Sequence, residues 1–177
     1  MRYLLLAAAL ALPLPALSAG GDTMTPPTPS ETTKTCKGQQ VWDEIKGRCV
    51  APKESSLDQD GLFEAARELA YAGRNKDAQA VLSAMHDQDA PRVLTYWGFT
   101  HRKLGNRALA QNYYDQAIAA DPNNLLARSY MGQGFVEEGQ FGLALAEWKE
   151  IRARGGAGTW PETSLRLALE TGATTSY

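Results

Sequence analysis

The sequence contains few of the side chains from which catalytic and metal sites are usually built. Its 177 residues include only two cysteines, Cys36 and Cys49, and two histidines, His86 and His101. These residues do not stand at spacings typical of zinc ligands, and no glycine-rich phosphate-binding loop is present. We therefore expect a protein that is not an enzyme and that holds no metal and no cofactor.

The sequence also lacks an excess of charge of either sign. It has 18 Lys and Arg residues against 20 Asp and Glu residues, a formal net charge of −2 at pH 7. Nucleic-acid-binding domains usually carry a basic stripe or patch, and none is visible here. No segment after residue 14 is long and apolar enough to span a bilayer. We expect no nucleic-acid partner and no membrane span in the mature protein.

Residues 1–19 are typical of a secretory signal peptide. Arg2 supplies a positive charge, residues 3–14 form an apolar run that is short for a membrane span, and residues 16–20 offer small side chains for cleavage. No cysteine lies near the cleavage region, so a lipid anchor is not indicated. A membrane anchor is the alternative interpretation, against which the short run and its prolines argue. We expect a periplasmic or secreted protein.

Residues 20–35, GGDTMTPPTPSETTKT, show no apolar periodicity. They contain Pro26, Pro27 and Pro29 among Thr and Ser residues. A segment of this composition cannot bury enough apolar surface to order itself. We therefore expect a disordered, solvated linker that acts as a spacer.

Residues 36–54 contain both cysteines of the chain. In an exported protein an even number of cysteines indicates a disulfide, here between Cys36 and Cys49. Closing this loop stabilises a fold by about 3 kcal/mol in the chain-entropy description. A reactive thiol pair is the alternative, but such pairs favour C-x-x-C spacing. We expect a small disulfide-closed module.

The chain between the cysteines has the pattern of a short β-hairpin. Residues 40–42 and 48–50 would form its two strands, and Gly47 would supply a positive φ near the turn. Trp42 would then cover the disulfide, because a two-stranded hairpin alone is barely stable in water.

Over residues 55–171 one spacing pattern recurs three times. Each copy has a small residue, a bulky residue, a turn glycine, a second small residue and a second bulky residue at helical spacing. The three copies are Ala66, Leu69, Gly73, Ala78 and Leu82, then Gly98, His101, Gly105, Ala110 and Tyr114, then Gly132, Phe135, Gly139, Ala144 and Trp148. The pattern predicts pairs of amphipathic helices that pack closely at the small residues.

This pattern resembles the tetratricopeptide repeat, whose signature is W-x2-L-G-x2-Y, then A-x3-F, then P. The clearest copy reads Leu94-x2-Trp97-Gly98-x2-His101, then Ala110-x3-Tyr114, then Pro122. The resemblance implies an all-α protein, a short right-handed α-solenoid of three helix pairs. We place the repeats at 58–90, 91–124 and 125–155, a capping helix at 159–170 and a tail at 172–177.

Tetratricopeptide arrays bind peptides or partner domains in a concave groove lined by the first helix of each repeat. The resemblance implies an exported adaptor that binds a protein or peptide of the cell envelope, with an aromatic and basic groove suited to hydrophobic and acidic residues. The groove positions are Phe63, Arg67, Tyr71, Arg92, Thr95, Phe99, Arg102, Lys103 and Gln133. Alternatively, these side chains pack on neighbouring helices or on the linker.

Two further hypotheses belong to other functional classes. The disulfide module resembles a fragment of the peritrophin-type chitin-binding module, which implies a cell-wall or carbohydrate-binding protein with a sugar contact at Trp42. The residues that carry this likeness are Cys36, Trp42, Asp43, Cys49 and Pro52. An envelope enzyme or metal protein that uses His86 and His101 is the third possibility, and packing is the better interpretation of His101.

Overall fold

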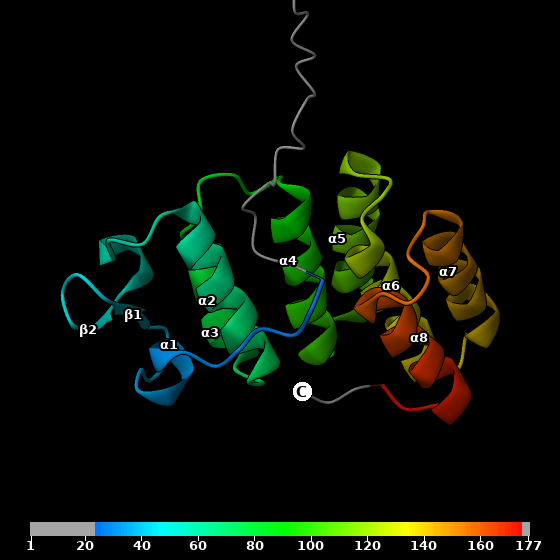
Figure 1. The fold of residues 1–177 in the computed structure, drawn as a ribbon, viewed down its shortest axis with the longest axis horizontal. Helices are drawn as coiled ribbons and strands as arrows, with labels where there is room; N and C mark the ends of the chain where they lie inside the picture. Colours follow the sequence, from blue (N-terminus) through cyan, green and yellow to red (C-terminus); the bar gives the residue numbers. More distant parts are fainter. Residues whose placement is uncertain (1–23, 175–177) are drawn as a thin grey trace, which may run out of the picture.

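The computed structural model describes residues 24–174 (Figure 1). The predicted signal peptide and residues 175–177 of the predicted tail lie outside the described residues. In chain order the elements are α1 (Glu31–Lys34), β1 (Val41–Asp43), β2 (Arg48–Val50), a short 3-10 turn (Pro52–Glu54), α2 (Gln59–Tyr71), α3 (Asn75–Leu82), α4 (Pro91–Lys103), α5 (Arg107–Ala120), α6 (Leu125–Glu137), α7 (Phe141–Ala153) and α8 (Trp160–Thr171). No helix in this part of the chain is long and apolar enough to cross a lipid bilayer.

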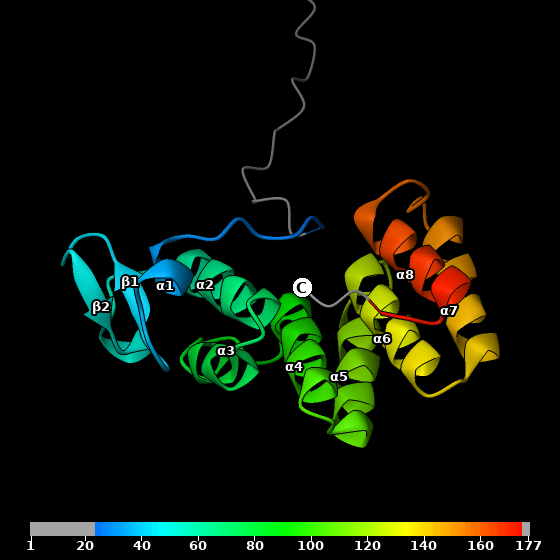
Figure 2. The same ribbon diagram turned by 90° about the horizontal axis from the view of Figure 1, so that it is seen from below.

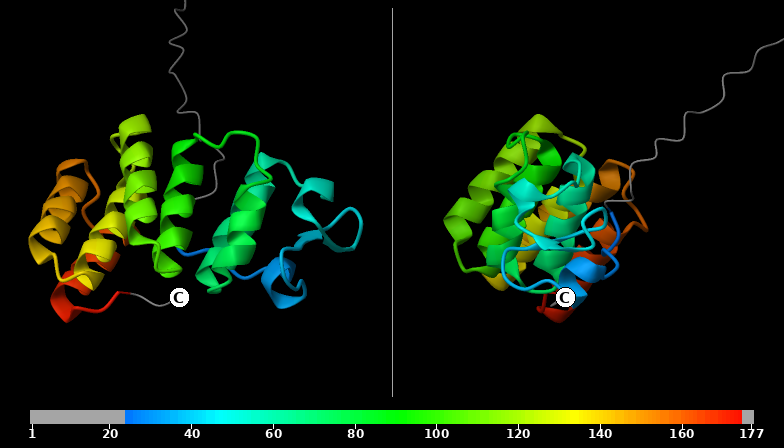
Figure 3. Two further views of the ribbon diagram at one scale, coloured as in Figure 1. Left: turned by 180° about the vertical axis from the view of Figure 1, so that it is seen from behind. Right: turned by 90° about the vertical axis from the view of Figure 1, so that its left-hand side faces the viewer.

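Three successive helix pairs, α2–α3, α4–α5 and α6–α7, form the body of the molecule. Within each pair the chain turns at a glycine in the left-handed region, with φ of 76° at Gly73, 84° at Gly105 and 73° at Gly139. Side chains other than glycine rarely adopt this conformation, which explains the regular spacing of these glycines. Seen from behind, the three helix pairs stand in one row, and α8 lies below the last pair (Figure 3). The predicted all-α solenoid is confirmed.

The last helix, α8, packs against both helices of the third pair. Gly132 of α6 lies under Leu165 of α8, where a Cβ at position 132 would come within 2.6 Å of a Leu165 methyl carbon. On the other side, the Trp148 indole N–H of α7 donates to Glu162 Oε1 at 2.8 Å. The helix therefore closes the end of the row and touches both α6 and α7.

At the other end, the disulfide module closes the row. Cys36 and Cys49 are bonded, and β1 pairs with β2 so that Trp42 faces Cys49 across the hairpin. Val41 and Val50 are buried in the same core cluster as the residues of α2 to α6. The predicted hairpin and disulfide are confirmed, and the module covers the exposed side of the first repeat, as a solenoid cap must.

The segment before the module differs from the solvated linker expected over residues 20–35. In its described part, residues 24–35, the chain lies along α2 (Figure 2). Ser30 caps the start of α1, and Glu68 of α2 accepts hydrogen bonds from Ser30 N and Thr33 N at 2.6 and 3.1 Å. Arg74 donates to the Cys36 carbonyl oxygen at 2.9 Å. Composition alone predicted disorder, whereas these polar contacts hold the segment against the repeats.

Candidate partner-binding face

The first helices of the three pairs, α2, α4 and α6, form one surface, which we call the inner face. A layer of aromatic rings links these helices, because Phe63 meets Tyr96 edge to face at 5.5 Å and Phe99 meets Tyr130 at 4.8 Å between ring centroids. The Tyr71 and Tyr130 hydroxyls are 2.5 Å apart. All of these rings are buried, so the layer is part of the core.

The predicted groove residues therefore do not line an open groove. Apart from Arg92 and Lys103, which are partly exposed, they are buried, and they correspond to the alternative in which these side chains pack on their neighbours. The buried positions are Phe63, Arg67, Tyr71, Thr95, Phe99, Arg102 and Gln133. The sequence spacing placed these residues on the inner face, but it did not indicate that neighbouring side chains bury most of them.

The basic side chains of the inner face are compensated by neighbouring groups. Arg102 forms a salt bridge with Glu137 at 2.5 Å and lies 5.6 Å from the Phe99 ring centroid. Lys103 lies on the same ring at 5.8 Å, and burial together with the adjacent Arg102 charge lowers the pKa of the Lys103 ammonium. The buried guanidinium of Arg67 is paired with Glu64. The face thus presents much less free positive charge than the sequence suggested.

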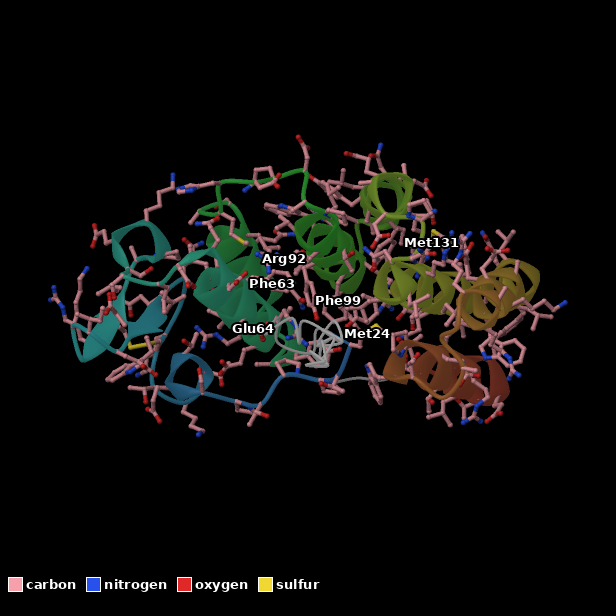
Figure 4. All side chains as sticks on the ribbon, turned by 45° about the horizontal axis from the view of Figure 1, so that its top comes forward. Met24, Phe63, Glu64, Arg92, Phe99 and Met131 are labelled. Carbon is pink, nitrogen blue, oxygen red and sulfur yellow. A yellow bond between two sulfur atoms is a disulfide. The ribbon has the colours of Figure 1, made fainter. Side chains whose placement is uncertain are left out.

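One part of the inner face remains open, a cleft of about 390 Å³ near the starts of α2, α4 and α6. We call it the inner cleft. Its apolar lining includes Met24, Phe63, Tyr96, Leu125 and Leu126, and its polar lining includes Arg92, Thr95, Asp121, Asn123 and Asn124. Figure 4 shows Met24 and Phe63 among the side chains of this region.

Arg92 is the predicted groove residue with the most open position in the inner cleft. Its guanidinium carbon lies 4.8 Å from the Phe63 ring centroid, and its Nη2 lies 2.7 Å from Asp60 Oδ1. The Arg92 side chain is 40% exposed, so it can contact a bound partner without rearrangement of the core. A cation held over an aromatic ring is attracted to the ring electrons.

Asn124 shapes the opposite rim of the inner cleft. Its Oδ1 accepts from Ala127 N at 2.9 Å and caps α6, while its Nδ2 donates to Thr95 Oγ1 at 2.9 Å. Asn is a favoured N-cap residue, so this cap could have been recognised in the sequence. Met24 could not have been found in this way, since it lies far from α6 in the chain and was assigned to the linker.

Residues 91–124, which include α4, α5 and one wall of the inner cleft, match the family model of the tetratricopeptide repeat. These residues form a tetratricopeptide repeat. No curated protein and no solved structure matches the chain. Tetratricopeptide repeats are modules of protein–protein interaction, so the match supports an adaptor or scaffold that binds a protein partner.

His86 and His101 are the histidines that could act as metal ligands or bases. His101 stacks on Trp97 and Tyr113 at centroid distances of 5.8 and 5.5 Å, and burial lowers the pKa of its imidazole. Among residues 24–174 no group of three or more His, Cys, Asp or Glu side chains is placed to hold a metal ion. We interpret His101 as a packing residue on the outer side of the second repeat.

A second cleft, of about 240 Å³, lies between the disulfide module and α2. Trp42 lines this cleft together with Thr28, Glu44 and Glu64. The Trp42 side chain is half-buried, and its backbone N–H donates to Thr32 Oγ1 at 3.1 Å. The cleft therefore combines an aromatic side chain with carboxylates.

Exposed apolar side chains, separate from the inner cleft, lie on α7. The side chains of Phe141, Leu143 and Leu145 are 49%, 51% and 40% exposed. The sequence pattern did not single out these residues, because they lie beside the repeat positions and not on them. They provide a natural point of comparison for experiments on the inner cleft.

Proposed function

We propose that this protein is an exported, non-enzymatic adaptor that binds a protein or peptide partner of the cell envelope in the inner cleft. The observation that carries the proposal is the cleft itself. It opens where the first helices of all three helix pairs begin, and it combines an apolar floor with the partly exposed Arg92. Binding sites for protein partners typically pair a buried apolar centre with a polar rim.

The cleft geometry also defines which residues should be changed. The earlier expectation that Phe99 and Arg102 contact the partner is replaced, because both are buried in the core. Arg92 and Asn123 lie at the rim and are accessible. Since export remains part of the proposal, the test must be made in the compartment that the signal sequence predicts.

Capture from an envelope fraction tests the proposal. A tagged wild-type protein, the Arg92→Ala variant and the Lys149→Ala variant are compared, Lys149 being an exposed residue of α7. We expect a defined partner to be retained by the wild type and by Lys149→Ala and to be depleted at least fivefold with Arg92→Ala. Equal retention by all three proteins would show that the inner cleft is not the binding surface.

The second cleft favours one alternative function, carbohydrate binding by the disulfide module. Aromatic side chains bind sugars through stacking, and the carboxylates of Glu44 and Glu64 can accept hydrogen bonds from sugar hydroxyls. Retention on chitin or peptidoglycan is compared for the wild type and Trp42→Ala. Retention that requires Trp42 would support the alternative, and no retention of the wild type would remove it.

A further inference from the structure

Residues 24–30, Met-Thr-Pro-Pro-Thr-Pro-Ser, cross the inner face as an extended segment that we call the strap. Figure 2 shows it running along α2 from the start of α1 towards the middle of the molecule. No residue of the strap lies in a helix or strand. Its three prolines favour an extended chain and leave little conformational entropy to lose on docking. The strap therefore lies on the inner face in the manner expected of a peptide ligand.

Arg67 holds the N-terminal half of the strap. Its Nη2 donates to the Thr25 carbonyl oxygen at 2.6 Å. The rest of the guanidinium is already fixed, since Nε donates to the Tyr96 hydroxyl at 3.2 Å and Nη1 donates to Glu64 at 2.6 and 2.9 Å. The Arg67 side chain is 3% exposed. The Arg67 Nη2 group is therefore oriented by the other contacts of the guanidinium. It can donate to any extended chain that places a carbonyl oxygen at this point.

Glu68 holds the C-terminal end of the strap. Its Oε1 accepts from Ser30 N at 2.6 Å and its Oε2 accepts from Ser30 Oγ at 2.6 Å. Glu68 is buried, and a buried carboxylate needs hydrogen-bond donors to offset its lost hydration. An occupant must therefore supply an N–H and a hydroxyl, and an acidic side chain at this place is repelled.

Met24 anchors the other end of the strap in the inner cleft. It packs against the core cluster formed by α6, α7 and α8, and it lines the cleft with Phe63 and Leu126. The unbranched methionine side chain adapts to an irregular apolar surface. Along the strap, the inner face thus contacts first an apolar side chain (Met24), then a backbone carbonyl oxygen (Thr25) and last a hydroxyl side chain (Ser30).

We propose that the inner face recognises extended, uncharged segments rich in proline, serine and threonine, and that the strap is the intramolecular competitor of such a segment in the partner. The proposal rests on the function proposed above and adds the chemistry of the partner. A tethered segment has an effective concentration on the order of millimolar, so the strap lowers the apparent affinity for the partner until it leaves.

A peptide with the sequence of the strap, residues 24–30, and an N-terminal fluorophore is the probe for this competition. Its binding is followed by fluorescence anisotropy with the purified wild type, Met24→Asp and Met24→Leu. Asp in the apolar cleft is expected to release the strap, whereas Leu retains it. We expect the peptide to bind Met24→Asp at least tenfold more tightly than the other two proteins. Equal binding to all three proteins, or binding to none, would overturn the proposal.

Methyl NMR of wild-type protein labelled at methionine supplies a test that needs no variant. Met24 is expected to resonate away from its position in the free peptide, because it packs in the cleft. Addition of unlabelled peptide should move the Met24 methyl signal towards the free-peptide position and leave Met85 unchanged. A Met24 signal already at the free-peptide position would contradict docking of the strap.

The two proposals fail in different ways. If the peptide binds as described but no cellular partner is found at the inner cleft, the adaptor function is wrong and the strap inference stands. If a cellular partner is found there but the peptide does not compete with the strap for the inner face, only the proposed chemistry of the partner is wrong.

Discussion

Gly98 of α4 lies directly against the ring of Tyr114 of α5. A Cβ at position 98 would come within 2.5 Å of Tyr114 Cε1, a distance that carbon atoms do not adopt without displacement. Tyr114 is itself buried, so its ring has little room to move. The close approach of two helices at this glycine holds the second repeat together.

Replacing Gly98 with alanine is expected to destabilise the protein. Overpacking of a filled core costs about 1–3 kcal/mol, and the better helix propensity of alanine offsets at most about 1 kcal/mol of this. Gly142 of α7 is the matched control, because a Cβ there meets no atom within 4 Å. Urea unfolding should show a lower midpoint for Gly98→Ala and an unchanged or higher midpoint for Gly142→Ala.

Phe99 is expected to be a stability residue and not a contact for the partner. It is fully buried and touches the rings of Tyr71, Tyr96 and Tyr130. Truncation of a buried Phe to alanine costs about 3–5 kcal/mol. The free energy of unfolding of Phe99→Ala should fall by this amount, while that of Arg92→Ala should stay close to the wild type. A Phe99→Ala protein as stable as the wild type would contradict the buried aromatic layer.

The disulfide is expected to stabilise the cap at the start of the solenoid. Cys36 and Cys49 are 13 residues apart in sequence, and closing a loop of this length is worth about 3 kcal/mol in the chain-entropy description. The double variant Cys36→Ser, Cys49→Ser should therefore unfold at lower urea concentration. Addition of a thiol reductant should lower the midpoint of the wild type and leave that of the double variant unchanged.

Asp43 is expected to make stability depend on pH in the acid range. Its carboxylate accepts from the Ser56 hydroxyl at 2.7 Å and from the backbone N–H groups of Lys46 and Ser56 at 2.9 and 2.7 Å. The Ser56 hydroxyl bond acts most strongly, and with the two N–H groups and the Lys46 charge it lowers the pKa of Asp43 to about 2, although burial acts in the opposite direction.

Because the pKa of Asp43 is lower in the folded protein than in the unfolded chain, its contribution is complete above about pH 4 and is lost as the pH falls towards 2. The difference in unfolding free energy between the wild type and Asp43→Asn should therefore shrink over this interval. A difference that is the same at pH 2.5 and pH 6 would show that Asp43 has no lowered pKa.

The repeat architecture could be predicted from the sequence because it depends on the spacing of residues that are close together in the chain. Small residues such as Gly98 and turn residues such as Gly105 recur at fixed positions, and each position has one structural reason. The hairpin followed in the same way from two cysteines and Gly47. These features depend on neighbours in the chain, so a single sequence is sufficient to read them.

The site was harder to predict because it depends on contacts between distant segments. Arg67 and Phe99 were assigned to the correct helix faces, but nothing local indicated that the strap and the aromatic layer would cover them. Met24 reaches α6 across about a hundred residues of chain. Proline-rich composition predicted a solvated linker, and the partners that order it, Arg67 and Glu68, follow much later in the sequence.

Photo-crosslinking in intact cells tests most directly whether the inner cleft binds the partner. A photoreactive amino acid is placed at Asn123 on the cleft rim and, in a separate protein, at Leu143 on the exposed surface of α7. We predict one defined crosslinked protein from position 123, absent from position 143 and reduced by Arg92→Ala. A partner that crosslinks from position 143 and not from position 123 would contradict the assignment of the inner cleft.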